Sequence, residues 1–244
     1  MLKKITVAGI CMLAVSTAAS ADALMLLNQD DAGDTPPPPA AVEKTPWYVA
    51  AAVGGNIALN AKMKDTDVKF KFKTGVGVNL GVGYAFAENL AVEVRSGIMW
   101  NKIKEVEGTY MGNAMLSGGS GHMYQVPVMA SVVYSLPINE KTNLGIKAGA
   151  GIQWTDFKAD SITLTTAPLL PLDNLSYSNK STAFRWELGL QLATQVATNV
   201  RVGGGVIFGG TSEVNIGELS GNSMEDKLKG LYNVSLGFGV NIAF

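Results

Sequence analysis

The stretch LYNVSLGFGVNIAF, residues 231–244, alternates large apolar side chains with small or polar ones. The large apolar residues occupy one set of alternate positions: Tyr232, Val234, Leu236, Phe238, Val240, Ile242 and Phe244. Because successive side chains of a β-strand point to opposite faces, this pattern predicts a strand with one apolar face and one small or polar face.

The same two-residue period recurs along most of the chain. In FKFKTGVGVNLGVGYAF, residues 70–86, we expect Phe70 and Phe72 on the apolar face. Lys71 and Lys73 then fall with the glycines on the other face. Applied throughout, the period predicts eight strands, at about residues 47–60, 69–86, 90–103, 121–136, 143–157, 181–194, 199–210 and 228–244.

The predicted connections alternate between short and long. The short ones lie near Glu88–Asn89, at PINEKT (137–142) and at VATN (196–199), and the long ones cover about 61–68, 104–120, 158–180 and 211–227. An up-and-down meander with this alternation has two different ends. Outer-membrane barrels have this asymmetry, with short periplasmic turns and longer extracellular loops.

The distribution of residues between the two faces decides between a soluble barrel and a membrane barrel. Charged residues and glycines share the small or polar faces, while the apolar faces hold nearly all the aromatic residues. The interior of an eight-stranded barrel is just wide enough for side chains, which suits this mixture. Tyr232 and Phe244 bracket an apolar span of 12 residues, which at about 3.3 Å per residue and about 40° of tilt covers roughly 30 Å. The sequence therefore predicts an all-β, eight-stranded antiparallel up-and-down transmembrane β-barrel.

The first 45 residues differ in composition from the rest. Residues 1–21 contain two lysines, an apolar run and a small-residue cleavage pattern, which predicts an export signal peptide. Residues 22–45 contain four consecutive prolines and are expected to form a proline-rich periplasmic linker. The barrel domain is then residues 46–244.

Cysteine and charge usage exclude some functions. The only cysteine, Cys11, lies in the predicted signal peptide, so the mature chain has no disulfide or thiol chemistry. Without the signal peptide, 17 basic residues face 20 acidic ones, a net charge of −3. Since the chain also has no basic run, we expect no nucleic-acid partner.

Three stretches give the chain a family resemblance: GYAFAENLAVEVRSG (83–97), YQVPVMASVVYSL (124–136) and LGFGVNIAF (236–244). Together they make residues 46–244 resemble the small bacterial outer-membrane β-barrels, the group of OmpX, the opacity proteins and the transmembrane domain of OmpA. The resemblance implies a location in the bacterial outer membrane, in contact with its lipid and lipopolysaccharide. It also implies recognition of the last strand by the barrel-assembly machinery, with Tyr232, Phe238, Val240, Ile242 and Phe244 as the assembly signal.

Eight charged residues are predicted to face the lumen: Lys71, Lys73, Glu93, Arg95, Lys147, Arg185, Glu187 and Arg201. Charges inside a narrow barrel must be paired or hydrated, because their isolated burial is costly. One interpretation is two salt-bridge clusters that plug the barrel, with Glu93 and Arg95 near Lys147 and Arg201, and Arg185 and Glu187 near Lys71 and Lys73. The other is a narrow path that prefers anions, because six of the eight are cationic.

Catalytic and metal-binding groups are scarce. His122 is the only histidine, and the two-residue period points it outward beside Tyr124, away from any orienting group. No cluster has metal-ligand spacing, and the GxG repeats lie inside strands instead of preceding a helix. We therefore expect neither an enzyme nor a cofactor.

The long loops remain as the place for a function. The third, residues 158–180, contains the apolar residues Leu169, Leu170 and Leu172 and the aromatic Tyr177. These are candidate contacts for a surface ligand, or alternatively a lid folded over the barrel mouth. The sequence thus predicts a structural or surface-interaction role through extracellular loops, with a narrow anion-preferring pore or small-solute transporter as the alternative.

Overall fold

The computed structural model describes residues 46–110, 112, 114–166, 172–219 and 225–244. The chain divides into two units, Met1–Glu43 and Lys44–Phe244, and all described residues belong to the second. The predicted signal peptide (1–21) and proline-rich linker (22–45) lie outside the described residues.

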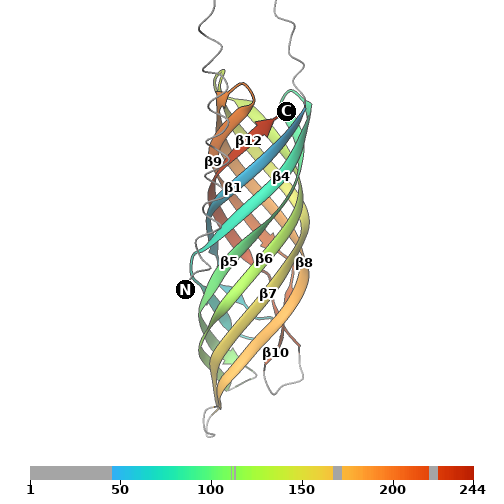
Figure 1. The fold of residues 1–244 in the computed structure, drawn as a ribbon. Coiled ribbons are helices and arrows are strands. Elements are labelled where there is room, and N and C mark those ends of the chain that lie inside the picture. The colour runs from blue at the N-terminus through green and yellow to red at the C-terminus, as the bar shows by residue number, and fades with distance from the viewer. Residues whose placement is uncertain (1–45, 111, 113, 167–171, 220–224) are drawn as a thin grey trace, which may run out of the picture. The chain divides into compact units, whose positions relative to one another are not determined.

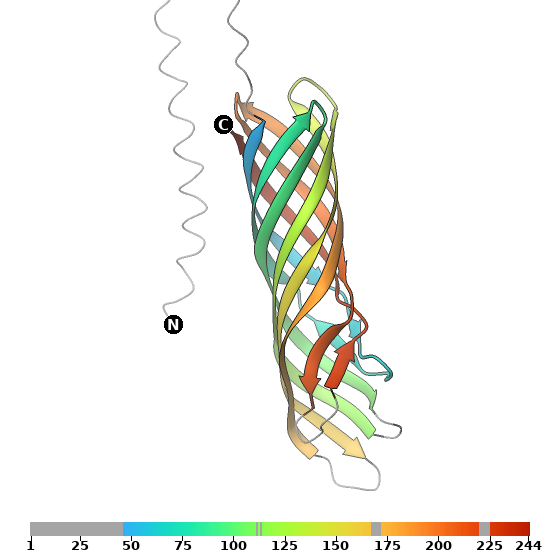
Figure 2. The same ribbon diagram turned by 90° about the vertical axis from the view of Figure 1, so that its right-hand side faces the viewer.

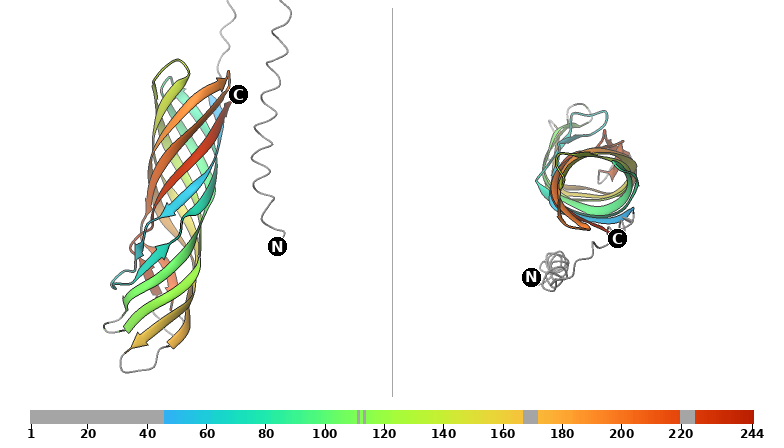
Figure 3. Two further views of the ribbon diagram at one scale, coloured as in Figure 1. Left: turned by 90° about the vertical axis from the view of Figure 1, so that its left-hand side faces the viewer. Right: turned by 90° about the horizontal axis from the view of Figure 1, so that it is seen from above.

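Eight antiparallel strands close into a ring, which confirms the predicted up-and-down barrel (Figure 1, and Figure 3 from above). They are β1 (Trp47–Ala58), β4 (Gly75–Ala87), β5 (Leu90–Tyr110), β6 (Ala114–Pro137), β7 (Thr142–Thr166), β8 (Leu172–Ala197), β9 (Val200–Thr211) and β12 (Tyr232–Ala243). Each strand pairs with the next one in this order, and β12 pairs with β1 to complete the ring.

The short connections gather at one end of the ring, the upper end in Figure 1. They follow β4, β6 and β8 and cover residues 88–89, 138–141 and 198–199. The backbone amide of Phe244 donates to the carbonyl of Trp47 at 3.2 Å, so the first and last strands also meet there. In an outer-membrane barrel this is the periplasmic end.

The exterior of the ring is a belt of exposed apolar side chains. Phe238 on β12 is 77% exposed, and leucine, isoleucine and valine side chains on every neighbouring strand are exposed as well. Apolar surface in contact with water costs about 25 cal/mol per Å², and a hydrocarbon surrounding removes that cost. The ring therefore presents to its surroundings the surface that a lipid bilayer requires.

Aromatic residues mark both edges of this belt. At the periplasmic edge the rings of Trp47 and Tyr84 lie 4.9 Å apart. At the opposite edge the ring of Phe208 lies 5.4 Å from Trp186 and 6.4 Å from Tyr232. Two such rims are typical of side chains placed at the two membrane–water interfaces.

Four strands of the ring continue far beyond the second rim. β5, β6, β7 and β8 have 21, 24, 25 and 26 residues, whereas β1, β9 and β12 have 12 each. Crossing the bilayer takes about 9–11 residues per strand. The excess length therefore projects away from the membrane at the end opposite the short turns, as Figure 2 shows.

Much of what we predicted as long loops is therefore strand. The predictions for 104–120 and 158–180 were wrong over most of their described residues because bulges interrupt the two-residue period. On β5 the inward residues Ile103 and Val106 are three positions apart, as are Ala159 and Ile162 on β7. A register shift of this kind hides a strand from a search for strict alternation.

Four short strands complete this projecting part: β2 (Ala61–Lys62), β3 (Lys69–Phe72), β10 (Val214–Glu218) and β11 (Glu225–Leu228). β3 pairs with β5 and β2, β10 pairs with β11, and a bridge joins Met63 to Leu228. The predicted strand 69–86 is thus divided between β3 and β4. We call residues 61–72, 103–110, 114–123, 157–166, 172–183, 214–219 and 225–231 the outer lobe.

The outer lobe has an apolar core of its own. Its fully or almost fully buried side chains include Met63, Val68, Phe70, Ile103, Val106, Leu116, Met123, Phe157, Ile162, Tyr177, Val214, Ile216, Leu228 and Leu231. Burying a single large apolar side chain contributes about 1.5–3 kcal/mol. The lobe is therefore a packed structure set on top of the membrane-spanning ring.

Candidate functional site

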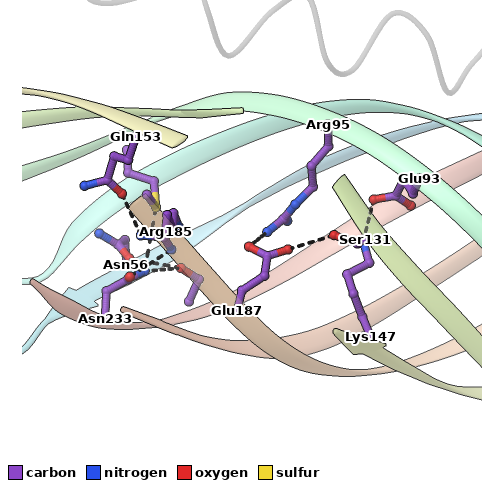
Figure 4. A network of polar contacts seen from close by, with 11 residues as sticks. Asn56, Glu93, Arg95, Ser131, Lys147, Gln153, Arg185, Glu187 and Asn233 are labelled. Carbon is purple, nitrogen blue, oxygen red and sulfur yellow. Dashed lines mark hydrogen bonds and ion pairs between the residues drawn. The ribbon is translucent and has the colours of Figure 1, made fainter. Parts of the chain in front are cut away.

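A network of buried polar side chains crosses the lumen within the membrane-spanning part of the ring (Figure 4). Arg95 on β5 forms an ion pair with Glu187 on β8, and Lys147 on β7 forms one with Glu93 on β5. Glu187 also accepts a hydrogen bond from Ser131 Oγ at 3.3 Å. All these side chains point inward because the two-residue period puts odd-numbered residues of these strands on the small or polar face.

The periplasmic part of this network includes an aromatic hydroxyl. Tyr48 OH on β1 donates to Glu93 Oε2 at 3.3 Å. The Tyr48 ring lies over Gly83 on the neighbouring strand, where even a Cβ atom would come within 2.0 Å of it. The sequence therefore combines a glycine on β4 with a large ring on β1 to bring the hydroxyl to the carboxylate.

The outer part of the network holds an arginine without a carboxylate in direct contact. Arg185 on β8 donates to Gln153 Oε1 at 2.6 Å and to Asn233 Oδ1 at 2.9 Å. Asn233 in turn donates to Asn56 at 2.8 Å, and Asn56 donates to Asn101 at 2.6 Å. Neutral amide oxygens thus hold this buried cation, and they tie β1, β5, β7, β8 and β12 together.

Five of the eight predicted lumen residues take part in this network: Glu93, Arg95, Lys147, Arg185 and Glu187. Their pairing differs from the two separate clusters that we expected, because Arg95 bonds to Glu187 instead of to a partner at its own level. This bond crosses the lumen, while the Lys147–Glu93 pair and the amide groups around Arg185 form separate sets of contacts beside it. Together the five residues carry three positive and two negative charges.

Lys71, Lys73 and Arg201 lie outside the network, contrary to the prediction. Lys71 Nζ lies 3.3 Å from Glu105 Oε2 and 2.6 Å from Glu107 Oε2, on the surface of the outer lobe. Lys73 is exposed after the end of β3, and Arg201 is exposed near the periplasmic end.

The break between β3 and β4 explains the error for the two lysines. Residues 73–74 belong to neither strand, and the register against β5 shifts between Lys71 and Phe72. As a result Phe70 points into the core of the outer lobe, and Phe72 packs against that core. Both phenylalanines were predicted to face outward, and a face assignment carried across such a break reverses.

Sequence reasoning did not name the neutral members of the network as site residues: Tyr48, Asn56, Asn101, Ser131, Gln153 and Asn233. Their inward positions follow from the two-residue period, so this signal could have found them. Their partners could not be read in the same way, because a buried amide can bond to many groups and the period does not give the height of one strand against another.

Apolar side chains fill the lumen on the outer side of the network. Met99 Sδ accepts a hydrogen bond from Asn233 at 3.7 Å, and Met123 lies buried beyond it. Further out the ring of Phe70 packs edge-on against Phe157 at 5.2 Å and against Tyr177 at 6.0 Å. A cavity of about 120 Å³ runs along the lumen beside the polar network, lined by Glu93, Arg95 and Lys147 together with glycines and alanines, and it reaches Met99. The packed part of the lumen therefore coincides with the start of the outer lobe.

Within the outer lobe, a half-buried carboxylate joins β11 to β5 and β8. Asp226 Oδ2 accepts hydrogen bonds from Tyr177 OH at 2.8 Å and from Tyr110 OH at 3.2 Å. Burial raises the pKa of Asp226 above its ordinary range, and the two hydroxyl donors oppose this effect only in part. Burial also raises the pKa of Tyr177, with the charge of Asp226 as the next cause, so its hydroxyl stays a donor.

The four residues predicted as loop contacts lie in different surroundings or outside the described residues. Leu169 and Leu170 lie outside the described residues. Leu172 is 59% exposed at the start of β8, whereas Tyr177 is fully buried. The proposal of Tyr177 as a contact for a ligand was wrong, because its ring belongs to the lobe core and its hydroxyl is held by Asp226.

His122 faces outward from β6, and its ring lies 5.2 Å from that of Tyr124. Within the described residues, no group of three or more histidine, cysteine, aspartate or glutamate side chains is arranged to hold a metal ion. The described part of the chain also has no helix long and apolar enough to span a membrane.

The residues proposed as an assembly signal lie on β12 or directly after it. Tyr232, Phe238 and Phe244 are exposed on the outer face of the ring. Val240 and Ile242 alternate with the inward residues of the same strand and pair with Ala51 and Val49 of β1. The assembly role itself stays a prediction.

Comparisons with known proteins agree with this architecture. The family model for the outer membrane protein beta-barrel domain matches residues 10–244. No curated protein sequence matches the chain significantly.

Three solved structures illustrate the similarity in fold. The outer membrane protease OmpT from Escherichia coli has a TM-score of 0.51 at 9% identity, covering 83% of this chain and 99% of its own. OprG from Pseudomonas aeruginosa has a TM-score of 0.47 at 14% identity, covering 82% and 97%. Neisserial surface protein A has a TM-score of 0.45 at 14% identity, covering 81% and 97%. At such low identity these likenesses concern the fold alone.

Proposed function

This chain belongs to the outer-membrane protein β-barrel family, and we propose that within it the chain serves as a surface-presenting barrel. The protein resides in the bacterial outer membrane. Its membrane-spanning ring is the support, and the outer lobe is the part that contacts a ligand at the cell surface. The observation that carries this proposal is the extension of β5–β8 into a lobe with its own apolar core.

The packing of the lobe supports a binding role. A loop without a core would lose much conformational entropy when it binds, and that loss reduces affinity. Here the core side chains Phe70, Phe157 and Tyr177 hold the strands in place before any ligand arrives. Surface residues such as Leu172, which is exposed, are then presented in a fixed arrangement.

The filled lumen favours this role over the alternative of an anion-preferring pore. Of the six cations that we counted toward such a path, Lys71, Lys73 and Arg201 lie outside the network, and Arg95 and Lys147 are paired with carboxylates. The apolar layer of the outer lobe follows directly. A path for ions would have to pass both.

We also propose that the protein is not an enzyme. Hydrolysis by a side-chain base needs a base beside a nucleophile or activated water and a group that orients it. The only histidine of the chain, His122, lies edge-on to Tyr124 on the outward face of β6. The similarity to the protease OmpT concerns the fold alone.

We further propose that the barrel-assembly machinery recognises β12. The outward side chains of this strand form an apolar row that the machinery can contact before β12 pairs with β1. The row consists of Tyr232, Phe238, Val240, Ile242 and Phe244. Phe238→Ser, at the most exposed of these positions, should lower the amount of assembled protein in the outer membrane. An unchanged amount would contradict this role.

The surface role can be tested with whole cells. Cells that display the native barrel are compared with cells displaying a barrel in which short turns replace 104–120 and 159–178. Both are applied to a panel of immobilised glycans and extracellular-matrix proteins. We expect retention on at least one surface with the native barrel only. Insertion of both proteins is verified by gel electrophoresis, in which the heated, unfolded protein migrates more slowly than the unheated, folded protein. Equal retention of the two cell types on every surface would overturn the proposal.

The exposed apolar position Leu172 offers a narrower version of the same test. Leu172→Asp changes the surface of the lobe and leaves its core intact, since this side chain is 59% exposed. Glu218→Gln, on β10, serves as a control with a similar small change on another strand of the lobe. Loss of retention with the first variant alone would place the contact at the start of β8.

A further inference from the structure

The buried polar network of the lumen carries a surplus positive charge. Its two ion pairs, Arg95 with Glu187 and Lys147 with Glu93, are each neutral. Arg185 is left over: it is 2% exposed, and among the described residues its hydrogen-bond partners are amide oxygens. Because an unpaired charge inside a membrane protein is costly, this surplus calls for a counter-charge.

Two guanidinium groups of the network also keep an unused donor. Among the described residues, Nε of Arg95 and Nε of Arg185 are buried and have no hydrogen-bond partner. A buried N–H of a charged group that lacks an acceptor costs free energy, and an anion is the strongest acceptor that it can bind. The cationic part of the network therefore lacks acceptors.

A cavity beside these groups gives a ligand room. Its volume is about 120 Å³, and its lining includes Arg95, Lys147 and Asn56. Asn56 accepts a hydrogen bond from Asn233, and Asn233 Oδ1 in turn accepts one from Arg185, as Figure 4 shows. Since a water molecule takes up about 30 Å³ in the liquid, the cavity suits an ion or a molecule of only a few atoms.

The room exists because one side of the lumen has very short side chains. The strands β1, β9 and β12 line the cavity with residues such as Ala52, Gly205 and Gly239, whereas β5 and β7 contribute Arg95 and Lys147. The small residues thus face the cationic groups across the cavity. The side chain of Arg95 is 9% exposed, so its free Nε is buried at this site instead of pointing into bulk water.

The cavity is reached from the periplasmic end of the ring. Its lining includes Asn241 near the end of β12, and the register pairs Asn241 with Arg201 of β9. Arg201 is exposed, so solvent reaches the ring at this level, and its charge attracts anions toward the mouth. The core around Phe70 and Phe157 closes the other end. A ligand therefore enters and leaves by the same side.

We propose that this cavity binds one small monovalent anion from the periplasm, such as chloride or formate. The anion accepts a hydrogen bond from Arg95 and offsets the surplus charge that Arg185 leaves in the network. A monovalent ion matches a surplus of one charge, whereas a divalent ion would reverse the sign of the network. The site is a dead end instead of a path through the barrel, and it does not depend on the surface role of the outer lobe.

The test uses the refolded barrel in a neutral detergent, with chloride as the probe. Bound chloride is measured from the line width of the chlorine NMR signal, which increases when free chloride exchanges with a site on the protein. We expect an excess line width that added formate removes by competition. Gluconate at the same ionic strength should leave it unchanged, because this carboxylate is too large for the cavity.

A filled cavity separates this site from ordinary surface binding. Ala52→Leu occupies the cavity while every charge stays in place, so it should remove most of the excess line width. The matched control is Ala148→Leu, which adds the same side chain at an exposed position on the outward face of β7 and should leave the line width unchanged.

A second pair of variants tests the surplus charge. Arg185→Gln should weaken chloride binding about tenfold, because it removes the charge that the anion offsets. Its control, Lys180→Gln, removes a charge from the same strand at a position whose side chain is 81% exposed, and it should bind chloride as the native protein does.

Gel electrophoresis of heated and unheated samples verifies that each variant folds. If Arg185→Gln fails to fold, the comparison of Ala52→Leu with Ala148→Leu decides. Equal line widths for these two variants, no excess line width for the native protein, or competition by gluconate as strong as that by formate would overturn the proposal. None of these measurements involves binding at the cell surface, so the proposed surface role is tested separately.

Discussion

Arg95 on β5 forms a buried ion pair with Glu187 on β8, across a sequence separation of 92 residues. β6 and β7 lie between these strands in the ring, so the pair spans the lumen instead of bridging adjacent strands. Such a bond braces the ring from inside. It also occupies the space through which a solute would have to pass.

Removing one partner of this pair leaves a buried charge without compensation. We expect Glu187→Ala to destabilise the folded barrel by about 3–5 kcal/mol in urea unfolding from lipid vesicles. Replacement of both partners, Arg95→Met with Glu187→Met, should cost less than Glu187→Ala alone, because no charge is then left unpaired. Glu140→Ala, in an exposed turn, is the matched control. A double variant less stable than Glu187→Ala would contradict this account.

The core of the outer lobe should unfold separately from the membrane-spanning ring. Phe157→Ala removes a fully buried ring and should destabilise the lobe by about 3–5 kcal/mol. Limited proteolysis of the inserted protein should then cut within the lobe, while the ring stays protected. Phe238→Ala, in the lipid-facing belt, should leave the cleavage pattern of the lobe unchanged. Equal resistance of Phe157→Ala and the native protein would contradict a packed lobe.

Protonation of Asp226 at low pH should raise the free energy of unfolding of the outer lobe. Its pKa is raised in the folded protein, chiefly by burial. A carboxyl whose pKa is higher in the folded protein than in the unfolded chain stabilises the fold when it is protonated. This contribution is complete below the unfolded pKa, about 3.9, and is lost as the pH rises through the folded pKa. Asp226→Asn should therefore be at least as stable as the native protein at neutral pH, and the difference should shrink toward pH 4. Urea midpoints at several pH values measure this difference.

Glu213 supplies a control of opposite sign. Its hydrogen bond from Lys64 lowers the pKa of the carboxyl, so its contribution is present at neutral pH and lost as the pH falls through the lowered value. At neutral pH Glu213→Gln should be slightly less stable than the native protein. If Asp226→Asn behaved like Glu213→Gln, Asp226 would be an ordinary paired carboxylate.

Two adjacent glycines on β1 test how closely the strands approach. A Cβ atom on Gly54 would lie 2.0 Å from the carbonyl oxygen of Leu236. A Cβ atom on Gly55 would have its nearest neighbour, the carbonyl oxygen of Gly75, 4.0 Å away. Backbone cannot yield as a flexible side chain can, so Gly54→Ala should destabilise the barrel by about 1–3 kcal/mol. Gly55→Ala should change the urea midpoint little. Equal effects of the two substitutions would contradict the observed approach of β1 and β12.

The ring was predictable from sequence because lipid outside and a narrow lumen inside impose a strict two-residue period. The assignment of side chains to the outer and inner faces followed from the alternation, as in Tyr232–Phe244. The outer lobe escaped prediction because its bulges, as between Ile103 and Val106, break the period. Its residues are also buried by contacts between segments far apart in the chain.

The charged site was predicted as a set of inward residues and not as a set of pairs. Glu93, Arg95 and Glu187 were placed correctly on the inner face, but the period does not give the heights of β5 and β8 relative to each other. The bond between Arg95 and Glu187 depends on those heights. Lys71 was misplaced because the register against β5 shifts between Lys71 and Phe72, which reverses the face on which Lys71 was counted.

The most direct test of a closed lumen beneath a surface-binding lobe is planar-bilayer conductance of the refolded mature protein. Insertion is verified in the same preparation by protection of the ring from protease. We expect no steady current, because the core around Phe70 and Phe157 closes the lumen beyond the polar network. A steady anion-selective current that disappears on Arg95→Ala or Lys147→Ala would contradict the account and make the lumen the functional site.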